Sequence, residues 1–516
     1  MMERREQDVD LIVIGAGPTG LTAACEARRL GLSVVIIDRK EHRSTFSKAL
    51  VVHARTMEVM ETMGVSERVR AAGASFDALN AHFGSSEAVR MDLRGLDWGD
   101  TRYPYWLSIP QYETERCLEE HLIALGGAVR WRTSLESLEQ DQDSVSVTLR
   151  GPNGVVESLR AQWAIGCDGG GSATRRALGV AMERESLEET FVLADVHTTQ
   201  ALAEAEGHAW YGEGGLVLLV PMPEAGLFRL IAHMPERVEG ERFTLDEAFL
   251  DGLILERAGF ELGAHELAWT SQFDLHQGLA ERYRVGRIFL AGDAAHVHSP
   301  VGGQGMNTGI QDAHNLLWKL ALSRDLEPAA AELYLDSYQQ ERRATAKAMV
   351  QGTGRATRVL TSKQHFVGML LRALGPYLAS TQLLQEQLGR AVGMLDLVYQ
   401  DSAVLQEMPA VGLGQPSPGS RLPNPVLAEA TRLHDLLDPK EHTLFLFDGS
   451  PRKLTADGQL QRLDPRWEPI LRDALAVPGN GVVLVRPDRC VVGCWSDLAD
   501  LERFSPARAV LDTMGA

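Results

Sequence analysis

The chain begins with two short apolar runs separated by a helical pattern. Residues 9–14 and 34–37 are almost wholly hydrophobic, which predicts two buried strands, and the segment between them has the periodicity of a helix. A strand, a helix and a second strand in this order form a βαβ unit, whose two strands lie parallel in one sheet. The opening of the chain therefore predicts an α/β domain of the Rossmann type.

The pattern then alternates between helices and strands. Helical periodicity is expected at residues 54–64 and 112–125, whereas alternation of apolar and polar residues over 129–164 predicts a β-meander packed against the first unit. Residues 190–275 predict further strands. Because the nucleotide-binding pattern resumes near residue 287, we expect this strand-rich block to be inserted into the first domain.

Composition narrows the class of protein. A chain of 516 residues is long enough for about two to four domains. The net charge of −19 argues against a nucleic-acid or anionic membrane surface, because both need clustered Lys and Arg. No apolar run approaches the roughly 18 residues of a membrane-spanning helix. The polar, acidic start is unlike a signal peptide and the five cysteines are scattered, so we expect a cytoplasmic protein.

The first apolar run ends in a glycine-rich turn. Gly15 permits the tight turn, Gly17 lets the backbone approach a pyrophosphate, and Gly20 lets the following helix pack close to its strand. Backbone N–H groups at the start of that helix then hold the pyrophosphate. The carboxylate of Asp38 is placed to bind a ribose hydroxyl. The dinucleotide contacts predicted in this region are Gly15, Gly17, Pro18, Thr19, Gly20, Asp38 and Arg39.

Two further motifs lie downstream. One runs from Gly166 to Arg175 and contains Asp168 followed by three glycines. The other begins with Gly292 and Asp293 at the end of an apolar strand and continues into a glycine-rich loop, residues 300–307, that opens a helix. The order and spacing of all three motifs resemble the FAD-dependent aromatic hydroxylases, or group A flavoprotein monooxygenases. The closest resemblance is to the phenol and polyketide hydroxylases with a thioredoxin-like C-terminal domain.

The resemblance implies an activity. Such a protein binds FAD, is reduced by NADPH or NADH, and inserts one oxygen atom from O2 into a small aromatic substrate through a flavin C4a-hydroperoxide. The substrate expected is a substituted phenol or an aromatic polyketide. Two other interpretations stay open: a Baeyer–Villiger or epoxidising monooxygenase acting on a polyketide, and a flavoprotein that shelters a reactive intermediate without conventional turnover.

The resemblance also implies the domain order. We expect a Rossmann-type FAD-binding domain with an inserted β-sheet substrate domain, a helical segment and a small thioredoxin-like C-terminal domain. The expected boundaries are 1–189 for the first part of the FAD-binding domain (with 76–108 contributing to the substrate domain), 190–275 for the substrate-binding domain, 276–400 for the second part and the helical segment, 401–425 for a linker, and 426–516 for the C-terminal domain.

Residues around the flavin ring follow from the same resemblance. Pro300, Gly302 and Gly303 are expected beside the ring where oxygen adds, and they are the predicted catalytic positions. Asp293 is expected to present a buried acceptor to the ribityl chain. The helix that follows the glycine-rich loop would direct its N–H groups and dipole at the pyrimidine edge. Further cofactor contacts predicted here are Gln111 at the ribityl chain, and Gly292, Gly305, Met306 and Asn307.

Three charged residues complete the predicted cofactor site. Lys48 stands where the family often has an arginine at the pyrophosphate, so the contact keeps its charge but loses the bidentate geometry. Arg55 is expected to share that contact. Asp168 is expected between the flavin site and the region that NADPH visits.

Several residues have a structural and a functional interpretation. His296 and His298, inside the last motif, are expected to be structural rather than catalytic. The base that removes a phenol proton is not identified by the sequence. Four residues either line a flat apolar substrate pocket or belong to the core of a sheet: Trp210, Tyr211, Met222 and Phe228.

The C-terminal cysteines do not predict redox chemistry. Cys490 and Cys494 are separated by three residues instead of the two of a redox pair, so a packing or oligomer role is expected. No metal site is predicted. A homodimer is compatible with the sequence, which does not determine the oligomeric state.

Overall fold

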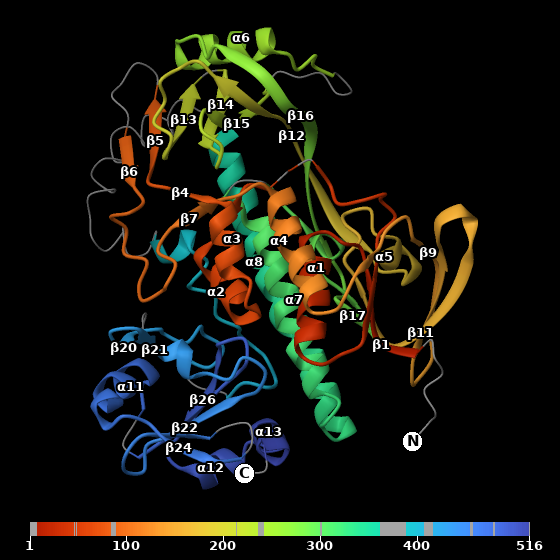
Figure 1. The fold of residues 1–516 in the computed structure, drawn as a ribbon, viewed down its shortest axis with the longest axis vertical. Coiled ribbons are helices and arrows are strands. Elements are labelled where there is room, and N and C mark those ends of the chain that lie inside the picture. Colours follow the sequence, from red (N-terminus) through yellow and green to blue (C-terminus); the bar gives the residue numbers. More distant parts are fainter. Residues whose placement is uncertain are drawn as a thin grey trace.

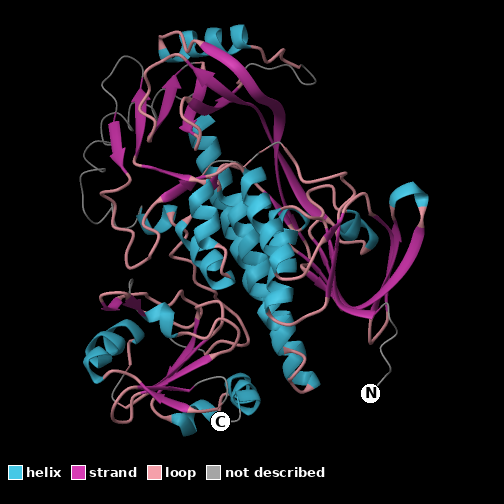
Figure 2. Cartoon of the chain, in the orientation of Figure 1, coloured by secondary structure: helices cyan, strands magenta, loops and turns pink. Residues whose placement is uncertain are grey.

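The protein is an α/β molecule with helices at its centre. Figure 1 shows the nucleotide-binding sheet beside these helices, an inserted sheet above them and a C-terminal domain below. The structure is a computed structural model, and Figure 2 shows the mixture of helices and strands that confirms the expected fold class. It describes residues 8–45, 47, 49–83, 89–212, 214–235, 242–299, 302–361, 389–406, 416–454, 458–477 and 480–514.

A mostly parallel sheet forms the nucleotide-binding half. Its strand order is β17-β18-β11-β1-β2-β8, and β1 pairs in parallel with both β2 and β11. Strand β11 also pairs in parallel with β18, so two segments that are far apart in the sequence end at the same edge. The strands are β1 (Asp8–Ile14), β2 (Val34–Ile37), β8 (Val129–Arg130), β11 (Val156–Gly166), β17 (Arg284–Val285) and β18 (Ile288–Leu290).

Both faces of this sheet are covered, which explains the uninterrupted apolar run of β1. Leu11 and Val13 belong to the core shared with the helices. Ile12 and Ile14 instead pack under the antiparallel hairpin of β9 (Ser134–Gln140) and β10 (Val145–Arg150). A strand buried on both faces needs apolar side chains at every position.

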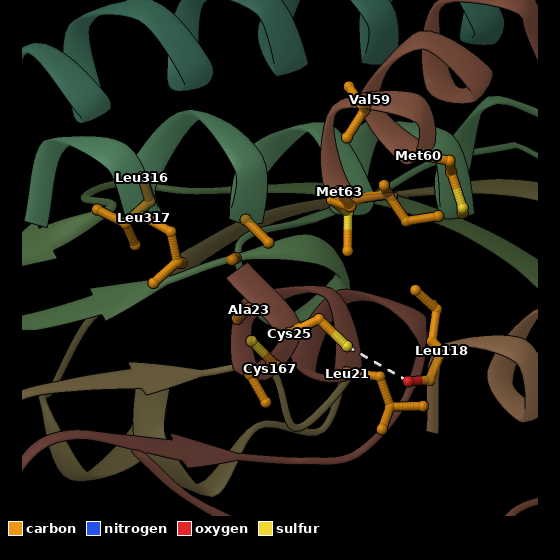
Figure 3. Packing of buried hydrophobic residues seen from close by; sticks show 14 of the residues in the cluster. Leu21, Ala23, Cys25, Val59, Met60, Met63, Leu118, Cys167, Leu316 and Leu317 are labelled. Carbon is orange, nitrogen blue, oxygen red and sulfur yellow. Dashed lines mark hydrogen bonds between the residues drawn. The ribbon is translucent and has the colours of Figure 1, made fainter. Parts of the chain in front are cut away.

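The helices on the other face pack closely against one another. Figure 3 shows side chains from α1, α2, α4 and α7 in one cluster, with Cys25 Sγ donating to the carbonyl of Leu118 at 3.3 Å. These residues lie on helices that are far apart in sequence, so the cluster fixes their positions. The helices of the nucleotide-binding half are α1 (Pro18–Arg29), α2 (Ala54–Met63), α3 (Ser66–Ala72), α4 (Gln111–Ala124), α5 (Ala173–Ala177), α7 (Gln304–Leu322) and α8 (Pro328–Thr361).

The inserted sheet has the strand order β19-β16-β12-β15-β14-β13-β5-β6, and α6 (Glu247–Ala258) covers one of its faces. Its two longest strands, β12 and β16, have 17 residues each and continue into the nucleotide-binding half. The strands are β5 (Ala78–Phe83), β6 (Val89–Asp92), β12 (Met182–Thr198), β13 (Glu206–Gly212), β14 (Gly215–Pro221), β15 (Leu227–His233), β16 (Ala264–Ala280) and β19 (His296–Val297).

A small three-stranded sheet joins the inserted sheet to the helices. It consists of β3 (Val51–Val52), β7 (Trp106–Ser108) and β4 (Ala74–Phe76), with β7 in the centre. Ser108 Oγ donates to the carbonyl of Pro221 at 2.7 Å, which fixes the tip of the β14–β15 hairpin above β7.

The C-terminal domain is built on a five-stranded sheet of order β24-β23-β22-β25-β26. All of its described pairings are antiparallel, and the expected thioredoxin-like fold is not confirmed. All five cysteines are free thiols. The elements are β20 (Val426–Ala428), β21 (Thr431–Arg432), β22 (Thr443–Leu446), β23 (Arg452–Leu454), β24 (Leu460–Arg462), β25 (Val482–Val485), β26 (Val491–Trp495), α11 (Glu468–Leu475), α12 (Leu498–Glu502) and α13 (Ser505–Met514).

The described part of the expected linker is packed into the fold. Arg421 is buried and donates to both oxygens of Glu58 on α2, at 2.6 and 2.8 Å, and to Asp100 at 2.9 Å. Burial would raise the pKa of the Glu58 carboxyl, but the charge of Arg421 holds it well below its usual value. A buried, paired carboxylate of this kind fixes the C-terminal segment against the nucleotide-binding half.

A second group of buried charges lies where the C-terminal domain meets α7 and α8. Glu341 on α8 accepts hydrogen bonds from Lys319 at 2.8 Å and from Arg486 at 2.7 and 3.0 Å. Arg486 also pairs with Asp488. Burial would raise the pKa of Glu341, but the charges of Arg486 and Lys319 lower it to about 2. The ionised carboxylate therefore compensates two buried cations.

We expect Glu341 to make folding sensitive to acid. Because its pKa is depressed in the folded state, its contribution is fully present above about pH 4.5 and is lost as the pH falls toward 2. Glu341→Gln leaves Lys319 without its carboxylate and Arg486 with Asp488 alone, and should cost about 3–5 kcal/mol. The measurement is urea unfolding followed by tryptophan fluorescence at neutral and acidic pH.

The matched control is Glu332→Gln on the same helix. Glu332 pairs with Arg284 but is 65% exposed, so its replacement should cost at most about 1 kcal/mol. Equal loss of stability in the two variants would contradict the role given to Glu341.

Candidate active site

The glycine-rich turn has the geometry that a dinucleotide requires. Gly15 has a φ of +104°, and a Cβ built on Gly20 would lie 1.8 Å from the carbonyl oxygen of Gly15. Glycine is therefore required at both positions. Gly17 begins α1 without a capping side chain, and a Cβ built on it would meet nothing within 4 Å. The N–H groups at the start of α1 thus border open space.

Asp38 closes this turn from the side of β2. Its carboxylate accepts hydrogen bonds from the N–H groups of Ala16 at 2.8 Å and Lys40 at 2.9 Å. The neighbouring Arg39 is exposed. A carboxylate has about four acceptor positions, so Asp38 keeps capacity for a ribose hydroxyl.

The motif that begins at Gly292 meets the glycine-rich turn at Thr19. Gly292 has a φ of +59°, and a Cβ built there would lie 2.5 Å from Thr19 Oγ1. A Cβ built on Gly309 would lie 2.3 Å from the same atom. Thr19 therefore packs between two glycines that bring α1, the end of β18 and α7 together. Asp293, expected to be buried, is exposed next to this contact.

The glycine-rich loop before α7 is held by Asn307. Its Oδ1 accepts from the N–H of His53 at 3.0 Å, and its Nδ2 donates to the carbonyls of Val51 and Gly303, both at 2.8 Å. Any cofactor contact of Asn307 is thus left to its backbone. Met306 beside it is half-buried.

Glycines shape the rest of this loop. Gly302 and Gly303 have φ values of +80° and +63°, and Gly303 begins α7 without a capping side chain. A Cβ built on Gly305 would lie 2.9 Å from Nε2 of His298, so a side chain is excluded there. Lys48, Pro300 and Val301 lie outside the described residues.

Two histidines near the loop, His53 and His298, are neutral at pH 7. Burial lowers the pKa of His53 to about 4, and burial with the neighbouring His296 lowers that of His298 to about 4. His53 Nε2 lies 3.0 Å from the carbonyl oxygen of Gly302. His53 thus links the start of α2 to the glycine-rich loop.

A buried carboxylate that the sequence analysis did not identify fixes the motif that begins at Gly292. Asp312 on α7 accepts from the N–H of Gly292 at 3.0 Å, from Nε2 of His296 at 2.7 Å and from Nε of Arg342 at 2.7 Å. Burial would raise its pKa, but Arg342 and His296 keep it below its usual value. The available signal was an acidic residue in the middle of the helix that follows the glycine-rich loop.

The motif around Asp168 is a local turn. The Asp168 carboxylate accepts from Ser172 Oγ, and from the N–H and Oγ1 of Thr174 at 3.0 and 3.1 Å. Arg175 donates to the carbonyls of Gly170 and Ala294, both at 2.8 Å. Arg175 therefore joins this turn to the motif at Gly292 rather than standing free for a phosphate.

Gln111 and Arg55 have different surroundings. Gln111 begins α4, and its backbone N–H donates to Ser47 Oγ at 2.8 Å, which positions Ser47. The guanidinium of Arg55 instead donates to Glu58 at 3.1 Å and to the carbonyl of Asp488 at 2.6 Å. Arg55 is therefore a link to the C-terminal domain rather than a pyrophosphate contact.

The aromatic residues named for the substrate pocket mostly belong to a core. Trp210 and Phe228 lie in the cluster under α6, and Trp210 stacks on His82 with ring centroids 4.8 Å apart. Met222 packs with Leu50 at the tip of the β14–β15 hairpin. The side chain of Tyr211 lies outside the described part of the structure.

Two features are absent from the part of the chain that the structure describes. No group of three or more His, Cys, Asp or Glu side chains there is arranged to hold a metal ion. None of the helices described is both long and apolar enough to cross a membrane.

Comparisons with known proteins agree with this geometry. The chain matches the FAD binding domain family over residues 8–353, more than half of its length. A 12-dehydrotetracycline 5-monooxygenase/anhydrotetracycline 6-monooxygenase of Streptomyces rimosus is 31% identical over 509 residues, 94% of this chain and 95% of that protein. A rifampicin monooxygenase of Streptomyces venezuelae is 33% identical over 504 residues, 96% of this chain and 98% of that protein.

A solved structure matches over the whole chain. Aklavinone-11 hydroxylase in a ternary complex with FAD and aklavinone superposes with a TM-score of 0.78 at 26% identity, covering 99% of this chain and 100% of that one. The resemblance to FAD-dependent aromatic hydroxylases is thereby confirmed. The chain belongs to the FAD binding domain family and is an FAD-dependent monooxygenase.

Proposed function

We propose that this monooxygenase uses NADPH or NADH and inserts one oxygen atom from O2 into a flat aromatic substrate, a substituted phenol or an aromatic polyketide. The observation that carries the proposal is the contact of Thr19 with Gly292 and Gly309, which joins two glycine-rich segments into one cradle. The relatives support the substrate class, since their names include tetracycline-type and rifampicin substrates.

The residues present fit FAD. The start of α1 at Gly17 would hold the pyrophosphate on backbone N–H groups, and Asp38 would accept from the ribose. Asp293, exposed beside the cradle, would accept from the ribityl chain. When bound, FAD supplies the redox chemistry that accepts hydride from NAD(P)H and activates O2.

The protein's own contribution is binding, charge stabilisation and exclusion of water. The uncapped N-terminus of α7 presents N–H groups and the positive end of the helix dipole, which favours negative charge at the site. Gly302 and Gly303 let the backbone approach a flat ring closely. The inserted sheet covers the site. Exclusion of water there limits wasteful release of peroxide before oxygen is transferred to the substrate.

The cradle predicts a contrast between two glycines. Gly17→Val should leave the apoprotein's melting temperature unchanged, because a side chain there meets nothing within 4 Å. It should weaken FAD binding at least ~10-fold for each charge-assisted hydrogen bond lost at the pyrophosphate. Melting of the apoprotein and FAD titration by flavin fluorescence provide the two measurements.

Gly20→Ala is the matched variant. Its Cβ would lie 1.8 Å from the carbonyl oxygen of Gly15, so both stability and FAD binding should fall. Unchanged FAD affinity in Gly17→Val would show that the pyrophosphate lies elsewhere.

The proposed reaction predicts substrate-dependent reduction. In anaerobic stopped-flow experiments with NADPH, a panel of phenols, hydroxyanthraquinones and tetracycline-type compounds should contain one that accelerates loss of flavin colour many-fold. Air should then yield a product with one added hydroxyl group. A lactone or an epoxide would instead favour the alternative oxygen insertions, and no reduction with any compound would favour a sheltering flavoprotein.

A further inference from the structure

The two faces of the inserted sheet have different partners. Ala232 on β15 belongs to the core under α6, so its neighbour His233 points to the opposite face, because side chains alternate along a strand. The register places Phe191 directly opposite His233, and Phe273 directly opposite Phe191. These three side chains therefore share the face that α6 leaves uncovered.

This second face is turned toward the nucleotide-binding half. Arg229, which lies on the same face of β15 as His233, donates to Ser47 Oγ and to the carbonyl of Ala49, at 3.4 and 3.5 Å. Helix α8 packs against β14 and β16 of this sheet. Figure 1 shows the same arrangement, with α6 above the sheet and the helices of the cofactor half below it.

Aromatic and aliphatic side chains gather on this face. The ring centroid of Phe191 lies 5.3 Å from that of His233. The rings of Phe191 and Phe273 are stacked, with their centroids 6.1 Å apart. Leu193 and Ile231 form the next pair along the two strands and are apolar. Stacked aromatic and aliphatic side chains of this kind suit a planar polycyclic molecule.

One titratable pair stands on this surface. Nε2 of His233 is hydrogen-bonded to Oε2 of Glu189 on β12. Because a carboxylate only accepts, Nε2 carries the proton and Nδ1 carries the lone pair. Nδ1 is buried and has no hydrogen-bond partner among the described residues. A buried acceptor without a partner is costly, and Nδ1 is the nitrogen of this pair that can accept a proton.

Residue 215, which lies beside Nδ1, is a glycine. Gly215 has a φ of +99°, and a Cβ built on it would lie 3.2 Å from Nδ1 of His233. Any other residue would place a carbon atom in tight contact with Nδ1.

We propose that His233, oriented by Glu189, is the base that removes the hydroxyl proton of a polycyclic phenol bound on this face. The inference rests on the proposed hydroxylation. The phenol O–H bond breaks, the proton moves to Nδ1 and the electron pair stays on the oxygen. The resulting imidazolium is paired with the Glu189 carboxylate, and the phenolate gives the ring the electron density that oxygen insertion requires.

Few other charges face His233 in the described structure. Arg257 of α6 donates to its backbone carbonyl at 2.6 Å, and Glu256 of the same helix lies beside the β13–β14 turn. Arg358 of α8 is paired with Glu185 of β12. Glu189 is therefore the described charge in direct contact with the imidazole.

The test is the pH dependence of product formation from about pH 6 to about pH 9. The probe is the hydroxyanthraquinone of the panel that best accelerates reduction of the wild-type flavin. His233→Asn should lower the rate at neutral pH by at least ~100-fold. The rate of this variant should recover as the pH rises, because the phenol then ionises unaided. Glu189→Gln removes a negative charge and should move the acid limb of the profile to lower pH by about one unit.

His208→Asn is the matched control. His208 also contacts another histidine, His82 at 3.2 Å, but it stacks on Trp210 under α6, on the opposite face of the sheet. The His208→Asn variant should therefore keep both the wild-type rate and the wild-type pH profile. FAD content and KM of each variant separate loss of folding or of substrate binding from loss of the base.

The outcomes are distinguishable. If the wild-type protein forms no hydroxylated product from any polycyclic phenol, the proposed function fails first, and this inference fails with it. If the wild type is active but His233→Asn keeps its rate, or is not rescued at high pH, the base lies elsewhere and the proposed function stands.

Discussion

A buried carboxylate, that of Asp312, holds the parts of the cofactor half in register. Its two oxygens bind the backbone of Gly292, the ring of His296 and the guanidinium of Arg342. Gly292 and His296 follow β18, Arg342 lies on α8 and Asp312 itself on α7, so the charge can be buried only when these three segments are all in place. Breaking one partner of a buried pair leaves an uncompensated charge, which makes this arrangement all-or-none.

The same helices carry the C-terminal domain. Arg342 on α8 binds Asp312, and the preceding residue, Glu341, compensates Lys319 and Arg486. Two adjacent residues of one helix thus connect the cofactor cradle on one side and the C-terminal domain on the other. Arg55 and Arg421 add a second set of contacts through Glu58. The C-terminal domain is therefore part of the framework that holds the cradle rather than an appended module.

The inserted sheet separates stability from chemistry by its two faces. The face under α6 is a conventional core that contains Trp210 and its stacked histidines. The face toward the cofactor half carries His233, Glu189 and flat apolar side chains. Residues that are adjacent in the sequence consequently have unrelated roles, and only the strand register assigns each to its face.

The sequence by itself determined the features that depend on local backbone requirements. The apolar run of β1, the glycines at 15 and 20, and the three motifs sufficed for the α/β class, for FAD and for the family. Tertiary structure alone decided what long side chains bind, because an arginine can reach partners on several elements. In the tertiary structure Arg55 of α2 binds the C-terminal domain, Asp293 is exposed, and Asp312 on α7 pairs with Arg342 on α8. Hydrophobic periodicity and glycine placement are local properties, whereas ion pairs and strand faces exist only once distant segments have packed together.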